Sequence, residues 1–377
     1  MAGIYVHIPF CESRCLYCDF FSTTEVEKRE QYADALLKET EDRRDELKGE
    51  TVGTVYVGGG TPSQLRTDTL RRIFEGIYAW YDVEEKAEVT VECNPEDVTP
   101  AFAEGLRTLP VNRVSMGVQT FDDNRLRFIR RRHTSQKSVE AVNLLKANGF
   151  QNISIDLMFG FPGEKLEEWE HDIDRAQELD VPHVSAYSLM YEEGTALTRL
   201  KESGKIAELD DEEMLEMYTL LINKMEKAGY RHYELSNFCQ PGKASRHNMS
   251  YWEGVPYLGI GAGAHSYDGR QRRWNVSALD KYMEGVLNST CYWEVEKLSD
   301  TDRFNEYVMT RLRTDKGMDT GWLRREFGGK IDMREFEQTL HRELESGCLV
   351  KEKGRVRLSR KGLYISDSVM SDLFVGV

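Results

Sequence analysis

Three cysteines near the start of the chain are the residues whose type and spacing most directly suggest chemistry. Cys11, Cys15 and Cys18 lie within eight residues of one another, whereas the other four cysteines are scattered singly. One thiol is left over from any disulfide, and a closed structural zinc site needs a fourth ligand. Three thiolates suit an iron–sulfur cluster that keeps one iron open. Two alternatives stay open: three loop cysteines close by chance, or a zinc site completed by a distant histidine.

The residues around these cysteines resemble the radical S-adenosylmethionine (SAM) superfamily. The run Tyr5–Phe10 leads into the first cysteine, and the aromatic Tyr17 stands immediately before the third, as is typical there. The resemblance implies that Cys11, Cys15 and Cys18 hold a [4Fe-4S] cluster, with the methionyl part of SAM on the fourth iron. It also implies an electron donor as a partner.

Short apolar runs alternate with longer amphipathic stretches through the first two-thirds of the chain. This alternation indicates βαβ units and a parallel sheet, with function at the C-terminal ends of the strands. The resemblance implies the same fold, a partial (β/α)6 barrel with the cluster loop after the first strand. Strands are predicted to begin near Ile4, Thr54, Glu88, Asn112, Asn152 and His183, with a weaker one near Tyr230, and helices are predicted over 25–47, 67–81, 135–148 and 165–179.

The second predicted strand runs into a glycine-rich turn, Gly58-Gly59-Gly60-Thr61-Pro62. Glycines let a backbone approach a ligand closely, although most turns of this kind are only tight turns. The spacing does not match the dinucleotide-binding fingerprint. In radical SAM proteins a glycine-rich segment at this place cradles the methionyl amine of SAM, and Gly59, Gly60 and Thr61 match it.

Polar side chains occur at or near the ends of the later strands. Glu92 and Gln119 stand at the tips of apolar strands, where a carboxylate and an amide can hold ribose hydroxyls. Arg131 lies in a basic run that is otherwise typical of a solvated helix face. The family resemblance implies that it pairs with the SAM carboxylate, which suits a guanidinium. Asp156 lies inside an apolar run, so its carboxylate needs a partner or a ligand. Together with Tyr5 and the glycine turn, these residues match the SAM-binding positions of the oxygen-independent coproporphyrinogen III oxidase group.

A second motif, His-Asn-x-x-Tyr-Trp beginning at His247, follows the barrel strands. Within this group it marks a haem-chaperone branch, which implies that haem is the cargo. An imidazole can ligate haem iron, and aromatic rings can pack on the macrocycle. His247 is therefore predicted to bind haem, with a hydrogen-bonded surface or core histidine as the alternative. A second glycine loop resembles the family's last SAM contact, near Ala264 and His265.

The last part of the chain changes to a mainly helical pattern. Two amphipathic helices, 319–327 and 333–346, precede a β-hairpin that turns at Lys353-Gly354, an order typical of a winged-helix-like α+β domain. Such domains often bind DNA. From Gly317 onward, however, eleven Lys/Arg stand against ten Asp/Glu, a net of +1, and the second helix is acidic. This makes a poor DNA reader. The family resemblance implies instead that the domain packs over the open barrel mouth.

Composition bounds the remaining possibilities. A chain of 377 residues accommodates a radical SAM core and extension, 1–295, and a small C-terminal domain, 296–377. Apolar content of 40% with 31% charged residues is typical of a globular protein, and no apolar run reaches the length of a membrane span. The net charge of −15 argues against a nucleic-acid partner. Few cysteines and no signal segment predict a cytoplasmic location.

The pattern favours a radical-SAM-type haem chaperone, which binds haem and passes it to haem-requiring acceptors such as respiratory proteins. The alternative is oxygen-independent coproporphyrinogen III oxidase, an enzyme that decarboxylates two propionates of a porphyrinogen. That oxidase has a long N-terminal arm and a fourth cysteine two places after the third. Here ten residues precede Cys11, and Phe20 occupies the place of the fourth cysteine. No catalytic residue is assigned, and the acidic charge disfavours a tRNA-modifying enzyme.

Overall fold

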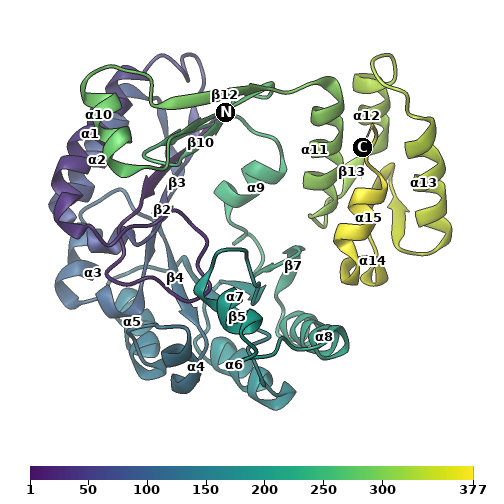
Figure 1. Cartoon of the computed structure of the whole chain (residues 1–377), viewed down its shortest axis with the longest axis horizontal. Helices are drawn as coiled ribbons and strands as arrows, with labels where there is room; N and C mark the ends of the chain where they lie inside the picture. The colour runs from purple at the N-terminus through teal and green to yellow at the C-terminus, as the bar shows by residue number, and fades with distance from the viewer. Residues whose placement is uncertain (377) are drawn as a thin grey trace.

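A computed structural model describes residues 1–376, and a sheet of parallel strands forms its centre (Figure 1). The strands β1 to β6 are adjacent in chain order and all parallel, so the predicted partial (β/α)6 barrel is confirmed. Their central residues are buried on both faces, as expected for apolar strands covered by helices. The bounds are β1 Ala2–Ile8, β2 Val52–Gly59, β3 Val83–Cys93, β4 Arg113–Gln119, β5 Ile153–Phe159 and β6 His183–Ser188.

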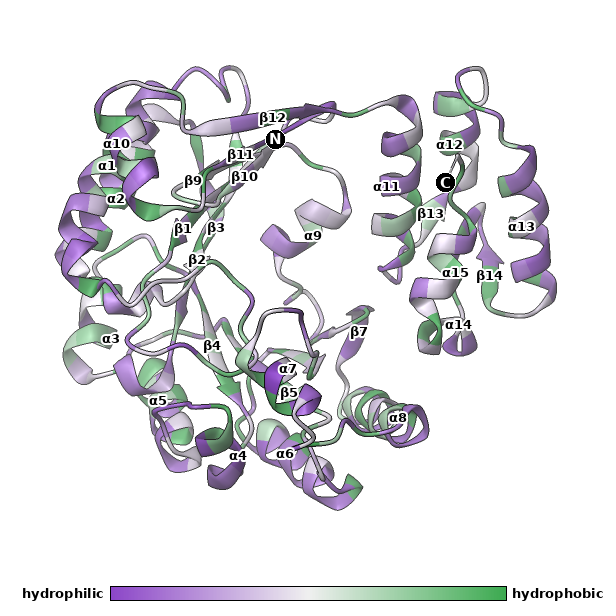
Figure 2. Ribbon diagram, in the orientation of Figure 1, coloured by the Kyte–Doolittle hydropathy of each residue, from purple (hydrophilic) through white to green (hydrophobic). Residues whose placement is uncertain are grey.

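Helices connect these strands and cover the outside of the sheet. Their inner faces are apolar: α6, for example, buries Trp169 and Ile173. In Figure 2, hydrophilic colour gathers on the outer surfaces of the helices, and the central strands carry stretches of hydrophobic colour. The Asp122 side chain accepts a hydrogen bond from the Arg125 amide and so caps α4. The bounds are η1 Val26–Lys28, α1 Arg29–Asp42, η2 Pro62–Gln64, α2 Thr67–Trp80, η3 Pro95–Asp97, α3 Pro100–Leu106, α4 Asp123–Phe128, α5 Ser135–Ala147, α6 Leu166–Glu178, α7 Ala196–Glu202 and α8 Asp211–Lys227.

Short strands extend the sheet at both edges. The weak strand predicted near Tyr230 is β7 (Arg231–Glu234), which pairs antiparallel with β8 (Asn237–Cys239) beside β6. At the other edge, β9 runs parallel to β1 and three antiparallel strands follow. These strands have three to five residues each, too few for a clear period in the sequence. They are β9 Tyr257–Ile260, β10 His265–Tyr267, β11 Gln271–Asn275 and β12 Trp293–Lys297.

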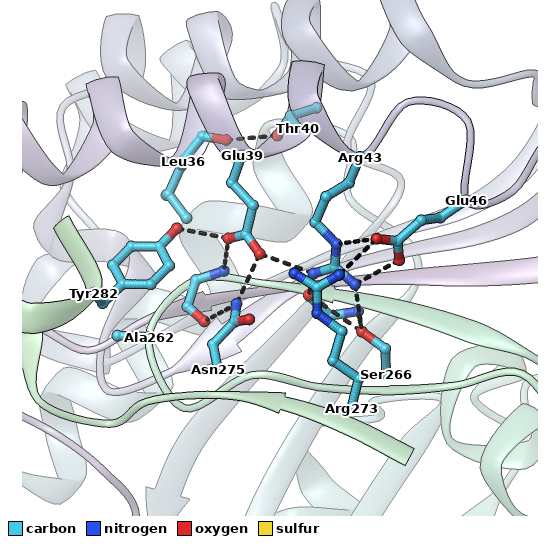
Figure 3. Close-up of polar contacts among 12 residues, drawn as sticks. Leu36, Glu39, Thr40, Arg43, Glu46, Ala262, Ser266, Arg273, Asn275 and Tyr282 are labelled. Carbon is cyan, nitrogen blue, oxygen red and sulfur yellow. Dashed lines mark hydrogen bonds and ion pairs between the residues drawn. The ribbon is translucent and has the colours of Figure 1, made fainter. Parts of the chain in front are cut away.

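A buried ion pair fastens α1 to this extension (Figure 3). The Glu39 carboxylate accepts hydrogen bonds from Arg43 Nη1 at 2.8 Å and Asn275 Nδ2 at 2.7 Å. It also accepts from the Tyr282 hydroxyl of α10 (Leu279–Leu287) and from the backbone N–H of the second glycine loop. Arg43 Nη1 donates to the Gly259 carbonyl at 2.6 Å. The network therefore fixes the second glycine loop to α1.

The C-terminal domain has the predicted order of two helices and a β-hairpin. The hairpin turns through Lys353 and Gly354, both left-handed with φ of 48° and 82°, which suits a two-residue turn. Phe304, Phe327 and Phe336 meet edge to face in its core. Division of the chain at residue 296 stays a prediction. The elements are α11 Asp300–Leu312, β13 Met318–Asp319, α12 Thr320–Phe327, α13 Arg334–Glu345, β14 Leu349–Glu352, β15 Arg355–Leu358, α14 Arg360–Tyr364 and α15 Ser366–Asp372.

The small domain packs against the open side of the barrel sheet, beside α8, β7 and α9 (Arg246–Trp252) (Figure 1). Arg313 pairs with Glu234 of β7 at 2.9 Å, and Arg360 Nη2 donates to Asn223 of α8 at 2.7 Å. Every residue that lines the cavity at the strand ends precedes α11, and the expectation that this domain covers the barrel mouth stays a prediction. Within residues 1–376, none of the helices combines the length and apolar character of a membrane span.

Candidate cluster and SAM site

A cavity of about 470 Å³ lies at the C-terminal ends of the barrel strands. The structure brings most of the predicted site residues to its wall, although they are spread over more than 150 positions of the chain. Cys11 is not among the lining residues but lies beside them, with its Sγ 3.4 Å from Thr61 Oγ1. The predicted residues that line the cavity are Tyr5, Cys15, Tyr17, Cys18, Gly59, Gly60, Thr61, Glu92, Gln119, Arg131 and Asp156.

The cysteine loop follows β1, and backbone hydrogen bonds hold it at both ends. The Cys11 amide donates to the Thr23 carbonyl at 2.9 Å, and the Leu16 amide donates to the Ile129 carbonyl at 3.2 Å. Burial raises the pKa of Cys11, and raises that of Cys18 from 9.0 to about 11. Because a thiolate is the ligand form, binding of iron must release these protons.

The three thiols are partly buried, and their surroundings fit a cluster. Within residues 1–376, no three His, Cys, Asp or Glu side chains converge as the ligands of a single metal ion do. A [4Fe-4S] cluster does not require such convergence, because each thiolate holds a different iron atom. Arg131 Nη1 points to Cys15 Sγ at 3.7 Å, so a cation stands where a cluster would place negative charge. The donor set therefore fits an iron–sulfur cluster better than a mononuclear zinc site.

The glycine turn after β2 brings its backbone close to the segment after β1. Gly59 has φ of +113°, and a Cβ there would lie 2.5 Å from the His7 ring. A Cβ on Gly60 would lie 2.8 Å from the Pro9 carbonyl carbon. Larger residues at either position would force the two segments apart, so the glycines serve this close approach. The Gly59 N–H donates to Glu92 Oε2 at 3.0 Å, which ties the turn to β3.

Two carboxyl groups face the cavity in a buried setting. Burial raises the pKa of Glu92 from 4.5 to about 7, although hydrogen bonds from Tyr56 and Gly59 oppose the shift. Burial likewise raises the pKa of Asp156 from 3.8 to about 6, opposed by Ser185 and by the charge of nearby arginines. The prediction that the Asp156 carboxylate requires a partner is confirmed in part. Ser185 and the nearby arginines are polar neighbours of Asp156, but its pKa is still raised. Carboxyls held in this way suit hydroxyl-bearing ligands.

Gln119 and Arg131 have unusual settings. Gln119 ends β4 at an irregularity in the strand register and has φ of +71°, a left-handed conformation that is uncommon outside glycine. Backbone strain of this kind gathers at ligand sites. Arg131 Nη2 donates to Asn94 Oδ1 at 2.8 Å and to the Gly117 carbonyl, while its buried Nε has no hydrogen-bond partner within residues 1–376. The structure therefore removes Arg131 from a solvated helix face and places it on the cavity.

Sequence reasoning missed Arg113, which also lines the cavity. Its side chain is only 2% exposed, and its Nε has no hydrogen-bond partner within residues 1–376. A cation near the start of an otherwise apolar strand is the signal that points to it, because buried arginines need a partner or a ligand. Tyr56 and Asn94 were missed as well, since both reach the cavity only through the packing of neighbouring strands.

His247 lies in the core, 1% exposed, rather than on the cavity. Its Nδ1 bonds Thr54 Oγ1 and its Nε2 bonds Tyr251 Oη, each at 2.8 Å. The ring stacks on Tyr56 at 4.9 Å, and burial lowers the pKa of His247 to about 3. In this conformation neither ring nitrogen is free for iron, and the contacts are those of a hydrogen-bonded core histidine. Haem ligation by His247 stays a prediction.

The second glycine loop lies beside the cluster loop but not on the cavity. A Cβ on Gly263 would contact the Phe21 ring at 3.4 Å, which places this loop against the segment that follows the cysteines. His265 is exposed and stacks on Trp274 at 5.9 Å. Neither Ala264 nor His265 lines the cavity, and their predicted contact with SAM stays a prediction.

Comparison with known proteins agrees with this geometry. The family model of the radical SAM superfamily matches residues 5–176, and that of the HemN C-terminal domain matches residues 298–365. The chain is 33% identical to the heme chaperone HemW of Bacillus subtilis (strain 168) over 372 residues, 98% of each chain. It is 34% identical to HemW of Mycobacterium tuberculosis (strain H37Rv) over 376 residues, covering 98% of this chain and 94% of that one.

Among solved structures, coproporphyrinogen III oxidase (HemN) from Escherichia coli, described as a radical SAM enzyme, superposes with a TM-score of 0.85. That match covers 100% of this chain and 90% of the other at 22% identity, and it shows a shared fold. A barrel of this topology, carrying three clustered cysteines after its first strand, defines the radical SAM class. The chain belongs to the radical SAM superfamily and, within it, to the HemW family.

Proposed function

We propose that this protein is a haem chaperone that carries a [4Fe-4S] cluster and SAM, binds haem and delivers it to haem-requiring acceptor proteins. The observation that carries the proposal is the similarity to HemW proteins over 98% of the chain. Respiratory proteins are the proposed class of acceptor, the cytoplasm is the proposed location, and a reductant for the cluster is a further proposed partner.

In this proposal the cavity residues divide into cluster and SAM functions. Cys11, Cys15 and Cys18 would hold the cluster, and a bound cluster would supply an electron to SAM. Gly59, Gly60 and Thr61 would approach the methionyl amine with their backbone, and Arg131 would pair with the carboxylate. The remaining lining residues, Tyr5, Tyr17, Glu92, Gln119 and Asp156, surround the nucleoside part.

The second candidate function is that of oxygen-independent coproporphyrinogen III oxidase. The similarity of its fold to that of HemN is the observation in favour of this function. This support is weak, because proteins of one fold can have different functions. The place two positions after Cys18 is occupied by Phe20, which lies at the cavity and is largely exposed. It offers no thiol there, which favours the chaperone.

Haem titration tests the proposal. The reconstituted protein should bind haem in a defined ratio with a shifted Soret band, and should transfer it to a haem-free acceptor protein. A featureless titration that matches free haem in buffer would overturn the chaperone proposal.

His247→Ala tests the ligand separately. If the His247 imidazole has only a structural role, as the hydrogen-bond partner of Thr54 and Tyr251, the variant keeps the Soret band of the wild-type haem complex and unfolds at a lower temperature. Loss of that band in a folded variant would instead establish His247 as the iron ligand, after release from its two partners.

A further inference from the structure

A second cavity, of about 530 Å³, lies between α9 and the C-terminal domain. Its volume is within the usual range of small-molecule sites. Neither the cluster nor SAM accounts for it, because none of its lining residues belongs to the first cavity. Aromatic side chains dominate its wall: Tyr251 and Trp252 from α9, Tyr257 and Tyr267 from the sheet extension, and Tyr307, Trp322 and Phe327 from α11 and α12.

Two of these rings, Tyr307 and Trp322, stack on each other in the cavity wall and form an aromatic platform there. Tyr307 and Trp322 stack with centroids 4.4 Å apart and planes 26° apart. Trp322 is 38% exposed, although it is one of the largest apolar side chains in the protein. A stacked pair that remains open to solvent beside a cavity offers a surface on which another flat ring can pack.

Two donors that also line the cavity, Trp252 Nε1 and the Arg311 guanidinium, are not paired with a carboxylate within residues 1–376. Trp252 Nε1 is buried and has no hydrogen-bond partner within residues 1–376. Arg311 Nη2 donates to the Glu253 carbonyl at 2.6 Å, and its guanidinium lies 5.2 Å from the Tyr307 ring centroid. Among residues 1–376 Arg311 forms no ion pair with a carboxylate, and burial lowers its pKa.

The other cavity arginines are already neutralised. Arg272 pairs with Glu306 at 2.6 Å, and Arg303 pairs with Asp300 at 2.9 Å. Arg311 and Trp252 therefore remain to receive an added anion. A guanidinium and an indole N–H together suit a carboxylate group.

We propose that this cavity binds a tetrapyrrole, with its macrocycle on the Tyr307–Trp322 platform and a propionate at Arg311 and Trp252. The inference rests on the proposed haem-chaperone function and deepens it by naming a cargo site apart from the SAM cavity. It also gives the His-Asn-x-x-Tyr-Trp motif a spatial role. In α9, Asn248 lines the SAM cavity while Tyr251 and Trp252 line this one, so the motif separates the two sites.

Iron-free protoporphyrin IX is the probe, because it tests ring and propionate recognition without an iron ligand. Arg311→Gln and Trp322→Ser in the full chain should each weaken its binding by about tenfold or more, measured by porphyrin fluorescence, because each removes a charged or stacking contact. SAM affinity should not change. Arg311→Lys should restore part of the affinity. The dimethyl ester of the porphyrin should bind the wild type about as weakly as the free acid binds Arg311→Gln.

The chain offers a matched pair of controls. Arg44 lies 5.5 Å from the Trp80 ring centroid on the far side of the barrel, and Trp80 is 43% exposed. Arg44→Gln and Trp80→Ser should leave porphyrin binding unchanged. If wild type binds haem but Arg311→Gln and Trp322→Ser bind the porphyrin like these controls, the site is wrong and the chaperone function stands. If wild type binds neither haem nor porphyrin, the inference and the proposed function both fail.

Discussion

Two regions of the molecule bury charged groups: in one the charges pair with each other, and in the other the charged groups lack full pairing. Beneath α1, Glu39 and Arg43 pair with each other, and Glu39 also accepts hydrogen bonds from Tyr282 and the second glycine loop (Figure 3). At the barrel mouth, burial raises the pKa of Glu92 and Asp156, and the buried Nε atoms of both cavity arginines have no partner within residues 1–376.

This difference in pairing distinguishes charged residues that stabilise the fold from charged residues that bind a ligand. Glu39 and Arg43 satisfy each other, although Asn275 Oδ1 and Arg273 Nε in the same network are buried without a partner within residues 1–376. Such a paired network fixes one conformation, and removal of one charge leaves the other with the cost of its burial. Perturbed and partly unsatisfied groups in a cavity are instead typical of a ligand site. Substitutions in the first region should therefore change stability, and those in the second should change binding.

The largest expected effect concerns the cluster. Replacing Cys11, Cys15 or Cys18 singly with Ala should abolish the visible absorption of the anaerobically reconstituted protein, because each thiolate holds one iron. Cys93→Ala, a buried cysteine of β3, is the control and should retain the absorption. Loss of the cluster in Cys93→Ala with retention in Cys18→Ala would show that the ligand set is wrong.

The next effect is on stability. Glu39→Ala removes one of the two carboxylates that pair with buried Arg43 and leaves the Asn275, Tyr282 and Gly261 donors without their acceptor. It should lower the free energy of unfolding by about 3–5 kcal/mol, measured by urea denaturation. The affinity for SAM of the folded protein should change little. Glu41→Ala, an exposed glutamate on the same helix, should change stability by less than about 0.5 kcal/mol. Equal losses in the two variants would refute the structural role of the network.

Arg131→Ala should show the reverse pattern. It removes a charge-assisted contact of about 1.5–3 kcal/mol, so affinity for SAM should fall by about ten- to a hundredfold in calorimetry. Iron analysis must show that the cluster is retained, since Arg131 also contacts Cys15. Arg127→Ala, an exposed arginine on α4, is the control. Unchanged affinity in Arg131→Ala would return this residue to a structural role.

The smallest effect is a pH dependence of the apoprotein. The pKa values of Glu92 and Asp156 are raised in the folded state to about 7 and about 6, so the folded state holds these protons more tightly than the unfolded state. Their stabilising contribution is complete below about pH 4 and is lost as the pH rises to about 7. Urea unfolding should show stability falling over this range by a few kcal/mol at most. In Glu92→Gln the fall should be smaller, and an identical slope would contradict the assignment.

The sequence predicts the parts of the fold that local patterns encode. Apolar runs locate β1 to β6, and the chemistry of the cysteine loop points to the cluster. Contacts that join distant segments could not be predicted in this way. His247 bonds Thr54, 193 positions earlier, and β10 has only three residues. The docking of the C-terminal domain against β7 and α9 likewise depends on surface contacts that have no sequence period.

The most direct test of the central claim is whether the protein converts a porphyrinogen. The reconstituted protein, with cluster intact and supplied with SAM and a reductant, is incubated anaerobically with coproporphyrinogen III, and product masses are measured. A chaperone leaves the substrate mass unchanged while the same preparation binds haem. Loss of two carboxylate groups as carbon dioxide at catalytic turnover would contradict the account and establish the oxidase function.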